Sequence, residues 1–332
     1  MNYSVSLLHG DGIGPEVVRA AQEVIAATGV AIDWKPCQAG AECYAKTGES
    51  LPEETLDSIR SHQVALKGPT ATASGVGFRS VNVQLRQALD LYANFRPARS
   101  IPGIRSRYDN VDVLVIRENT EGLYSGLEHT VVPGVVESLR VITEKATRRI
   151  VEFAFQIALD HQRKKVTAVH KANILKISDG LFLDVAREVA AENPGIQYDE
   201  CIVDAAAMKL VLNPQQFDVL VMENLFGDIL SDLTSGLVGG LGVTPSGNIG
   251  NELAVFEAVH GTAPDIAGKG IANPTAVILS GALMLRHLGE WSAAHRIEEA
   301  VREVIGQGRV VTGDLGGKAS TEEFTAEIVQ SL

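Results

Sequence analysis

The sequence predicts a two-domain protein of the α/β class, in which strands and helices alternate along the chain. Short apolar runs, such as residues 111–117 and 217–222, are separated by longer stretches in which apolar residues recur at helical spacing. With 332 residues, the chain is longer than the roughly 250–300 residues at which a single hydrophobic core usually stops growing. A content of 45% hydrophobic but only 5% aromatic residues, with 32 glycines, also fits an α/β enzyme.

The individual elements follow from local patterns. Residues 4–8 form a predicted strand, residues 10–14 a glycine-rich turn, and residues 15–28 a helix with Pro15 in its first turn. The same criteria predict further helices over residues 51–62, 82–90, 143–162, 179–193, 275–288 and 290–306, and further strands over residues 64–69, 111–117, 165–170, 196–203 and 217–222. Because no internal repeat or low-complexity linker is visible, we expect the two domains to be interleaved in sequence.

Composition excludes several classes of function. The net charge of −12 argues against general nucleic-acid binding, and no apolar stretch reaches the roughly 18–20 residues that a membrane span requires. The cysteines Cys37, Cys43 and Cys201 lack zinc-site spacing, and their odd number leaves one unpaired in any disulfide scheme. A reducing compartment, the cytoplasm, is therefore expected.

The glycine-rich turn of residues 10–15, GDGIGP, invites a dinucleotide-binding interpretation, but it does not meet the requirements. Pro15 stands where the third glycine of the G-x-G-x-x-G fingerprint should be, so the Rossmann fingerprint fails. Asp33, about 20 residues further on, is then expected to be an ordinary acid at the end of a strand.

A pair of aspartates gives the first indication of chemistry. Asp228 and Asp232 are four residues apart, and on a helix this spacing places both carboxylates on one face, about one turn apart. Like charges repel at this distance, and a hard cation such as Mg²⁺ or Mn²⁺ between them would remove the repulsion. The alternative is a solvated helix face. The preceding buried strand, residues 217–222, favours the metal site because open α/β sheets place their ligands beyond strand carboxyl ends.

Three arginines lie near the ends of predicted elements of this acidic protein: Arg86, Arg96 and Arg117. Guanidinium groups bind carboxylates through two parallel hydrogen bonds, so three of them in one pocket would suit a substrate with several carboxylates. Each arginine alone could instead form an ordinary surface ion pair.

Two further side chains could transfer protons. Lys171 follows an apolar strand, and a partly buried lysine can exchange protons at neutral pH, although a structural ion pair explains it equally well. Tyr124 follows Gly122 in a turn and could donate a proton, or simply pack. The loop of residues 260–265, HGTAPD, offers backbone N–H groups, an imidazole and an acid, which can hold adenosine and phosphate without a Rossmann fingerprint.

Together these motifs resemble the β-decarboxylating dehydrogenase family, which includes isocitrate, homoisocitrate and 3-isopropylmalate dehydrogenases. The branch of NAD-dependent isocitrate dehydrogenases is the most similar. The matching segments are GDGIGPE at residues 10–16, LDLYAN at 89–94, RENTEG at 117–122, HKAN at 170–173, GDILSD at 227–232 and HGTAPDIAG at 260–268.

The resemblance implies a two-domain fold with mixed sheets and without the Rossmann fingerprint. A large domain that carries the cofactor loops should comprise residues 1–91 and 239–332, and a small central domain residues 92–238. The family also implies a homodimer, or a multiple of it, in which an arm at about residues 122–164 locks two subunits together. Neither nucleic acid nor membrane is expected as a partner.

The resemblance further implies NAD-dependent oxidative decarboxylation of isocitrate to 2-oxoglutarate and CO₂, with Mg²⁺ or Mn²⁺. Substrate binding is implied for Ser80, Asn82, Arg86, Arg96 and Arg117, with Ser80 and Asn82 at the carboxylate that distinguishes isocitrate. The metal is implied to bind Asp228 and Asp232 of one subunit and Asp204 of the other. Lys171 of the neighbouring subunit would act with Asp204 on the C2 hydroxyl proton, and Tyr124 would protonate the enolate.

NAD binding is implied for nine residues: Thr72, Glu257, His260, Gly261, Thr262, Ala263, Asp265, Ile266 and Asn273. Asp265 and Ile266 occupy the positions where NADP-using relatives carry lysine and tyrosine. An acid there accepts hydrogen bonds from a free ribose 2′-hydroxyl and repels a 2′-phosphate, so NAD is the expected cofactor.

Some alternatives stay open. Glu223 stands where the most similar branch usually has proline and is typical of the isopropylmalate branch, whereas Ser80 and Asn82 favour isocitrate. Homoisocitrate is one methylene longer, and discrimination by one methylene is worth only about 1–3 kcal/mol. Some relatives are regulatory subunits without turnover, but this chain keeps the arginines, Tyr124, Lys171 and the three aspartates.

Overall fold

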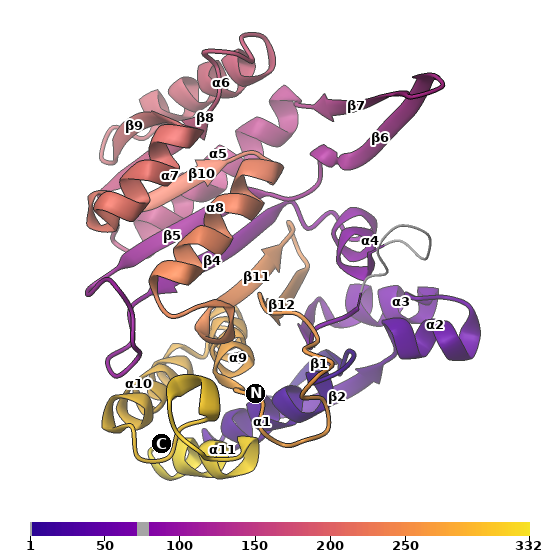
Figure 1. The fold of residues 1–332 in the computed structure, drawn as a ribbon, viewed down its shortest axis with the longest axis vertical. Coiled ribbons are helices and arrows are strands. Elements are labelled where there is room, and N and C mark those ends of the chain that lie inside the picture. The colour runs from indigo at the N-terminus through magenta and orange to yellow at the C-terminus, as the bar shows by residue number, and fades with distance from the viewer. Residues whose placement is uncertain (1, 72–79) are drawn as a thin grey trace. The chain divides into compact units, whose positions relative to one another are not determined.

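The computed structural model describes residues 2–71 and 80–332, and it divides into two compact units (Figure 1). Unit 1 comprises Met1–Leu91, Ser100–Asp109 and Val238–Leu332, and unit 2 comprises Tyr92–Arg99 and Asn110–Leu237. Both ends of the chain therefore belong to unit 1, and the chain passes from one unit to the other several times.

The segment Ser100–Asp109 groups with unit 1, although it lies inside the range expected for the central domain. Its Ile101 is buried. Gly103 lies so close to α10 (Trp291–Gln307) that a Cβ atom would be 2.2 Å from the carbonyl oxygen of Ile305. This close packing against α10 explains why the segment belongs to unit 1.

Five strands of unit 1 lie side by side in the order β2-β1-β3-β12-β11. Their bounds are β1 Asn2–Leu8, β2 Ala31–Cys37, β3 Val64–Lys67, β11 Pro245–Ile249 and β12 Ala254–Ala258. β11 runs antiparallel to β12, and the other neighbours are parallel. β3 and β12 are buried along their whole length, as expected of central strands with covered faces.

The helices of unit 1 form two groups. α9 is the most buried of them because it packs against α1, α10, β11 and β12. α3 contacts β1, β2 and β3, where a core cluster forms around Ile59, Leu8 and Val81. The bounds are α1 Gly14–Ala27, α2 Ala41–Thr47, α3 Glu53–His62, α4 Val81–Ala88, α9 Thr275–His287, α10 Trp291–Gln307 and α11 Thr321–Gln330.

Five strands of unit 2 lie in the order β4-β5-β10-β8-β9. Their bounds are β4 Ala93–Arg99, β5 Asp112–Glu118, β8 Lys165–His170, β9 Gln197–Ile202 and β10 Val219–Met222. β4 is antiparallel to β5, and the remaining neighbours are parallel. The mixed sheets confirm the predicted α/β class. Because β5, β10 and β8 are parallel, the segments that follow them leave from the same edge of the sheet.

Four helices accompany this sheet. α5 (Glu144–Asp160) packs against α6 (Ser178–Glu192) and against β5, β8 and β10, while α7 (Val203–Leu212) packs against α8 (Asn224–Leu237). Figure 1 shows α7 and α8 in front of the strands, with α5 behind them. The sheet of unit 2 is therefore covered on both faces.

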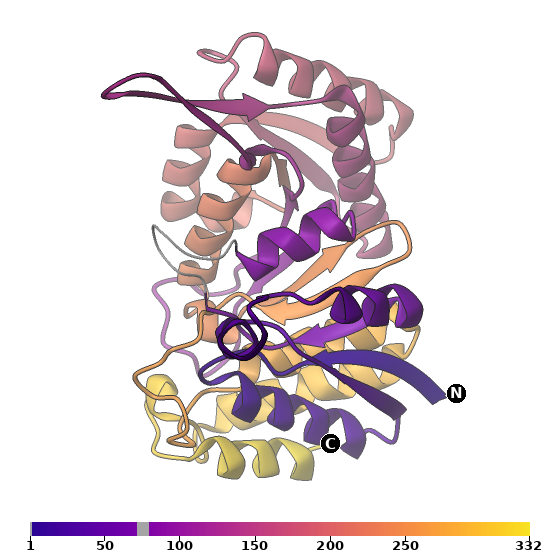
Figure 2. The ribbon, with the colours of Figure 1, turned by 90° about the vertical axis from the view of Figure 1, so that its right-hand side faces the viewer.

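A two-stranded antiparallel hairpin projects from unit 2, and we call it the arm (Figure 2). It consists of β6 (Gly122–Val132) and β7 (Val135–Val141). The resemblance placed the arm at about residues 122–164, but the hairpin ends at Val141. The following helix α5 buries Ile150, Val151 and Phe155, so it belongs to the body of unit 2 rather than to the arm.

Three short 3₁₀ helices complete the described chain: Pro214–Gln216, Leu241–Val243 and Gly313–Leu315. Helix α10 is mixed in polarity, since charged residues alternate with the buried Ile297 and Val301. Within residues 2–71 and 80–332, none of the helices combines the length and the apolarity needed to span a bilayer.

Candidate active site

Arg117 forms the centre of a polar cluster at the edge of the unit 2 sheet. It lies near the end of β5, and only 1% of it is exposed. Its Nε and one terminal nitrogen donate to Asn224 Oδ1 at 3.0 and 2.7 Å, while the other terminal nitrogen donates to Asp228 Oδ1. Gly227 permits this arrangement because a Cβ atom there would be 2.4 Å from Arg117 Cγ. The glycine before Asp228 therefore makes room for the arginine side chain.

Tyr124 approaches the same carboxylate from the arm. Its hydroxyl donates to Asp228 Oδ2 at 2.6 Å, and the Arg117 guanidinium carbon lies 5.0 Å from the centre of its ring. Both oxygens of Asp228 thus accept hydrogen bonds, one from a cation and one from a phenol. Tyr124 is held close to the arginine and the acid that the sequence assigned to substrate and metal.

Arg96 bridges the second aspartate to the sheet. Its Nε donates to Asn94 Oδ1 at 2.7 Å, and one terminal nitrogen donates to Ser231 Oγ at 2.7 Å and to Asp232 Oδ1 at 3.0 Å. A second terminal nitrogen lies 3.9 Å from Asp228 Oδ1. The two buried arginines and the two partly exposed aspartates therefore neutralise one another.

The loop after β5 is fixed by its own side chains. Glu118 accepts hydrogen bonds from the backbone nitrogens of Thr120 and Glu121 at 2.9 and 3.0 Å. Asn224 Nδ2 donates to the carbonyl of Glu121 at 3.0 Å, which joins the loop to α8. This turn leads directly into β6 and fixes the backbone just before Tyr124.

The structure places Asp228 and Asp232 on one face of α8, with hard oxygen donors one turn apart. This donor chemistry fits Mg²⁺ or Mn²⁺. Two carboxylates alone do not complete a site, and among residues 2–71 and 80–332 no group of three or more His, Cys, Asp or Glu side chains could hold a metal ion. Asp204 is therefore not brought to Asp228 and Asp232 within one chain.

Asp204 instead pairs with Lys171, whose ammonium group donates to its Oδ1. Asp204 lies in the first turn of α7 with 70% of its side chain exposed. The hydrogen bond from Lys171 is the largest cause that lowers the pKa of Asp204. The backbone nitrogen of Lys171 donates to the buried Asp179 Oδ2 at 2.5 Å, which fixes the chain at the end of β8.

The remaining predicted substrate residues belong to unit 1. Ser80 precedes α4 and accepts the Gln84 backbone nitrogen with its carbonyl at 3.0 Å. Asn82 Oδ1 accepts a hydrogen bond from Thr70 Oγ1 at 3.4 Å. Arg86, on the same helix, is buried, and one of its terminal nitrogens lies 3.9 Å from Glu257 Oε1.

Glu257 is part of a buried ion pair. Its Oε2 accepts a hydrogen bond of 2.6 Å from Lys67, and its Oε1 accepts one of 2.8 Å from Asn248. Burial alone would raise the pKa of Glu257, but the charges of Lys67 and Arg86 outweigh burial and lower it. Glu257 is not among the residues that line the pocket of unit 1 described below, and its implied contact with the cofactor stays a prediction.

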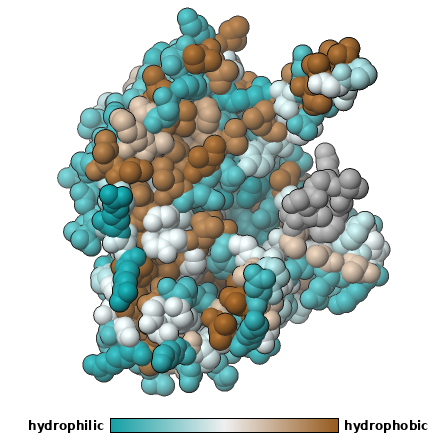
Figure 3. Space-filling view, in the orientation of Figure 1, coloured by the Kyte–Doolittle hydropathy of each residue, from teal (hydrophilic) through white to brown (hydrophobic). Residues whose placement is uncertain are grey.

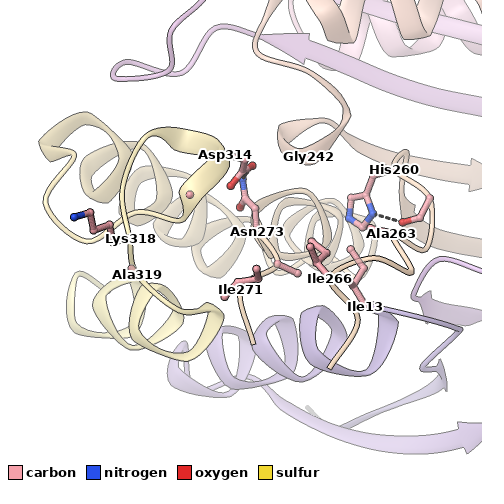
Figure 4. Close-up of a pocket in the computed structure, with 13 residues that line it drawn as sticks. Ile13, Gly242, His260, Ala263, Ile266, Ile271, Asn273, Asp314, Lys318 and Ala319 are labelled. Atoms are coloured by element: carbon pink, nitrogen blue, oxygen red, sulfur yellow. Dashed lines mark hydrogen bonds between the residues drawn. The ribbon is translucent and has the colours of Figure 1, made fainter. Parts of the chain in front are cut away.

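A pocket of about 750 Å³ opens in unit 1 (Figure 4). His260 and Ile13 lie on one side, and Asn273 and Asp314 lie next to each other, away from His260. The lining residues are Ile13, Gly242, His260, Gly261, Ala263, Ile266, Ile271, Ala272, Asn273, Gly313, Asp314, Lys318 and Ala319. An apolar pocket with a few polar groups is typical of a site for a cofactor of nucleotide size.

His260 is prepared to bind a polar ligand. Its Nδ1 is 3.0 Å from the Gly261 carbonyl, and its buried Nε2 has no hydrogen-bond partner among the described residues. Burial is the main cause that lowers the pKa of His260, so the neutral imidazole is favoured. A buried nitrogen without a partner is costly, and a hydrogen-bonding ligand would remove that cost.

Five of the nine predicted cofactor residues line this pocket: His260, Gly261, Ala263, Ile266 and Asn273. Thr262 and Asp265 belong to the same loop but are not among the lining residues, and Thr72 lies outside the described residues. The sequence interpretation missed Ile13, Asp314 and Lys318. A carboxylate in the polar segment at residues 312–314 was the sequence signal that could have indicated Asp314. In the structure, Asn273 Nδ2 donates to Asp314 Oδ2 at 2.9 Å.

The GDGIGP turn acts as a structural clamp. Asp11 is buried, and its Oδ2 accepts the backbone nitrogens of Ala41 and Ala71 at 3.0 and 2.8 Å. Ile13 donates its backbone nitrogen to the carbonyl of Thr262 at 3.0 Å. Gly12 is required at this point because a Cβ atom would be 2.1 Å from the same carbonyl oxygen. The turn thus fixes the start of α2, the loop before Thr72 and the His260 loop.

Comparisons with known proteins agree over almost the whole chain. Residues 4–329 match the family model described as isocitrate/isopropylmalate dehydrogenase. The catalytic subunit 5 of mitochondrial NAD isocitrate dehydrogenase from Arabidopsis thaliana is 53% identical over 330 residues, which cover 99% of this chain and 88% of the relative. The chloroplastic 3-isopropylmalate dehydrogenase of Solanum tuberosum is 53% identical over 306 residues, covering 92% and 86%.

A solved structure is equally similar. The crystal structure of isocitrate dehydrogenase from Methylococcus capsulatus matches with a TM-score of 0.96 and 54% identity, covering 99% of both chains. Sequence and fold agree along the full length, so the chain belongs to the isocitrate/isopropylmalate dehydrogenase family.

Proposed function

We propose that the protein catalyses the NAD-dependent oxidative decarboxylation of isocitrate to 2-oxoglutarate and CO₂. The observation that carries this proposal is the cluster of Arg96, Arg117, Tyr124, Asp228 and Asp232 at one edge of the unit 2 sheet. It combines guanidinium groups for carboxylates, hard oxygen donors for a divalent ion and a phenol for proton transfer. Relatives named as isocitrate dehydrogenases support the same activity.

The substrate carboxylates are held by Arg86, Arg96 and Arg117. In the structure, Arg96 and Arg117 are already turned towards carboxylates, those of Asp232 and Asp228. A tricarboxylate can replace these internal partners once the aspartates have a cation to bind. Ser80 and Asn82 at the start of α4 take the carboxylate that distinguishes isocitrate from its analogues.

Mg²⁺ or Mn²⁺ would be held by Asp228 and Asp232 together with Asp204 of the partner subunit. When bound, such an ion supplies Lewis-acid stabilisation of the charge that develops on the oxygen at C2. The exposed position of Asp204 in α7 supports this assignment because its carboxylate is accessible to a second chain. The donor set of one chain, two carboxylates, is otherwise incomplete.

Protons are moved by residues at the two ends of the site. Lys171 of the partner subunit, paired with Asp204 of the partner subunit, accepts the proton of the C2 hydroxyl as the substrate is oxidised. Tyr124 delivers a proton to the enolate carbon after CO₂ leaves. Its hydroxyl already donates to Asp228 in the structure, so the phenol is oriented towards the metal-binding carboxylate.

NAD would be held in the pocket of unit 1. His260 and Asn273 would bind its adenosine part and the isoleucines would pack against the adenine, while the exposed Asp265 in the same loop would contact the ribose. When bound, NAD accepts the hydride from C2. The pocket volume of about 750 Å³ is sufficient for a nucleotide.

The protein is proposed to act as a homodimer or a multiple of it. The arm and the front of unit 2 carry exposed apolar side chains, visible as brown patches in Figure 3. They are Leu127, Val131, Val132, Val135, Val136 and Leu139 on the arm, Met208, Val211 and Leu212 on α7, and Ile229 on α8. Such apolar surface next to Asp204 and Asp228 favours an interface that brings these acids together.

Homoisocitrate and 3-isopropylmalate are the alternative substrates, and a regulatory subunit without turnover is the alternative role. Similarity does not separate them, since the Arabidopsis and potato relatives are equally identical to this chain. The polar pair Ser80 and Asn82 favours isocitrate over isopropylmalate. A cytoplasmic location is also proposed, because Cys37, Cys43 and Cys201 are all free thiols.

Turnover of the purified chain tests the proposal. With Mn²⁺ and NAD, the chain alone should oxidise isocitrate with a higher kcat/KM than homoisocitrate or 3-isopropylmalate. A preference for either analogue would overturn the substrate assignment. Absence of turnover in the presence of a folded dimer would assign the chain to the regulatory class.

A further inference from the structure

Arg140 links two buried carboxylates at the base of the arm. It lies in β7, with 14% of its side chain exposed. One terminal nitrogen donates to Asp179 Oδ1 at 2.6 Å, and its Nε lies 3.5 Å from Glu223 Oε2. Both carboxylates are nearly inaccessible to solvent. Arg140 therefore places a positive charge beside two buried carboxyl groups, which offsets part of the cost of burying them.

The first of these carboxylates controls the position of Lys171. Asp179 uses its two oxygens for two different partners: Oδ1 for Arg140, and Oδ2 for the backbone nitrogen of Lys171 at 2.5 Å. Lys171 follows the last residue of β8, so this contact fixes where the chain turns away from the sheet. A shift of Arg140 would move Asp179 and, with it, the start of the lysine side chain.

The second carboxylate controls the start of α8. Glu223 accepts the backbone nitrogens of Leu225 and Phe226 at 3.2 and 2.9 Å, which caps the helix that carries Asp228. The guanidinium carbon of Arg140 lies 5.2 Å from the ring centre of Phe226 in the first turn of α8. Arg140 thus contacts the beginning of α8 through both charge and packing.

Under the proposed function, Lys171 and Asp228 of one chain serve different active sites of the dimer. We infer that Arg140 is a positioning residue that couples these two half-sites: through Asp179 it sets Lys171 for the partner's site, and through Glu223 it sets α8 for its own. The inference rests on the proposed sharing of active sites. If it holds, a change at Arg140 affects both active sites of a dimer.

Hybrid dimers give the direct test. In a dimer of one Arg140→Met chain and one wild-type chain, both sites contain one displaced element, α8 in one site and Lys171 in the other. The hybrid should therefore have less activity than the mean of the two homodimers, by about two- to fivefold if the two displacements contribute equally. If Arg140 acted on only one element, one site would stay intact and the hybrid would reach at least half of wild-type activity.

Arg163 provides a matched control in the same unit. It also bridges two carboxylates, Asp112 and Asp218, and 12% of its side chain is exposed. Arg163→Met should leave kcat within about twofold of wild type, since it touches neither Lys171 nor α8, whereas Arg140→Met should lower kcat by about 10- to 100-fold with a smaller change in KM. Equal losses in the two variants would assign Arg140 a merely structural role.

A conservative variant keeps the test informative if Arg140→Met folds poorly. Arg140→Lys retains one charge but cannot span two carboxylates, so it should fold and still show the low hybrid activity. Mixed dimers of Lys171→Met and Asp228→Asn chains test the sharing of active sites separately from the coupling by Arg140. If those chains recover activity and the Arg140 hybrids equal the mean, the coupling is wrong. If those chains never recover, site sharing is wrong and the coupling falls with it.

Discussion

Lys67 and Glu257 form an ion pair that is almost completely shielded from water. The ammonium group donates to Glu257 Oε2 at 2.6 Å, and no part of Lys67 is exposed. The two residues lie on neighbouring parallel strands, β3 and β12, where Glu257 is paired with Lys67 in register. The pair thus joins the strand that precedes Gly68 to the strand that precedes His260.

The first prediction concerns the stability of this pair. Lys67→Met leaves the buried Glu257 with the neutral Asn248 and the more distant Arg86, and it should lower the free energy of unfolding at pH 7 by about 3–5 kcal/mol. Urea unfolding measures the loss. Arg60→Met is the control, because Arg60 forms exposed ion pairs with Glu53 and Asp57 and should cost no more than about 1 kcal/mol.

The sign of the pH dependence follows from the lowered pKa of Glu257. A folded-state pKa below the unfolded value of about 4.3 means that the stabilisation is present above that pH and is lost as the pH falls through the folded value. The difference in the free energy of unfolding between wild type and Lys67→Met should therefore become smaller in acid. A difference that is constant from pH 7 to pH 3 would show that the charge of Glu257 is not involved.

The second prediction concerns the sharing of active sites. Lys171→Met and Asp228→Asn chains should each be inactive as homodimers. Unfolded together and reassembled at equal amounts, they should recover about one quarter of wild-type activity, because half of randomly formed dimers are hybrids and each hybrid has one intact site. Hybrids that form, as seen by differently tagged chains, without any recovery would contradict the sharing.

The third prediction concerns Ser80. Ser80→Ala should lower kcat/KM for isocitrate by roughly 5- to 30-fold, since a polar group of the substrate is left without its partner. Use of an analogue that lacks the γ-carboxylate, such as malate, should change much less. Ser61→Ala, on the exposed surface of α3, should affect neither substrate. Equal losses on both substrates would place Ser80 away from the γ-carboxylate.

The fourth prediction concerns the cofactor. Wild type should prefer NAD to NADP, and Asp265→Lys with Ile266→Tyr should shift the ratio of kcat/KM values towards NADP. Asp314→Asn is the informative control. Asp314 lines the pocket, but its oxygens already accept hydrogen bonds from Asn273 and Thr312, so its substitution should not shift the ratio. A shift in this control alone would make Asp314 the discriminating residue.

The sequence predicted those features that depend on local periodicity. The spacing of Asp228 and Asp232 placed both on one helix face, and α8 carries them in that way. The long helices α1, α5 and α10 were predicted nearly at their observed bounds. Local patterns suffice here because each helix buries one apolar stripe, whatever it packs against.

Features that depend on distant partners could not be predicted. β11 and β12 lie in or near a segment rich in glycine, and β11 contains Pro245 and Gly247, so only their pairing with each other and with β3 identifies them as strands. The ion pair of Glu257 with Lys67 was not predicted either, because nothing local to Glu257 reveals a partner 190 residues away. Ile13 reaches the pocket through the same kind of long-range contact, with Thr262.

The clamp made by the turn around Asp11 has a consequence for the synthesis of the protein. Its contacts need Ala71 and Thr262, and β12 lies between β3 and β11, so unit 1 lacks the middle of its sheet until residue 258 has left the ribosome. The residues of unit 2 end at Leu237, so this unit can begin to fold earlier. We therefore expect the nascent N-terminal segment to remain protease-sensitive until the last third of the chain emerges, which digestion of ribosome-bound chains of increasing length would reveal.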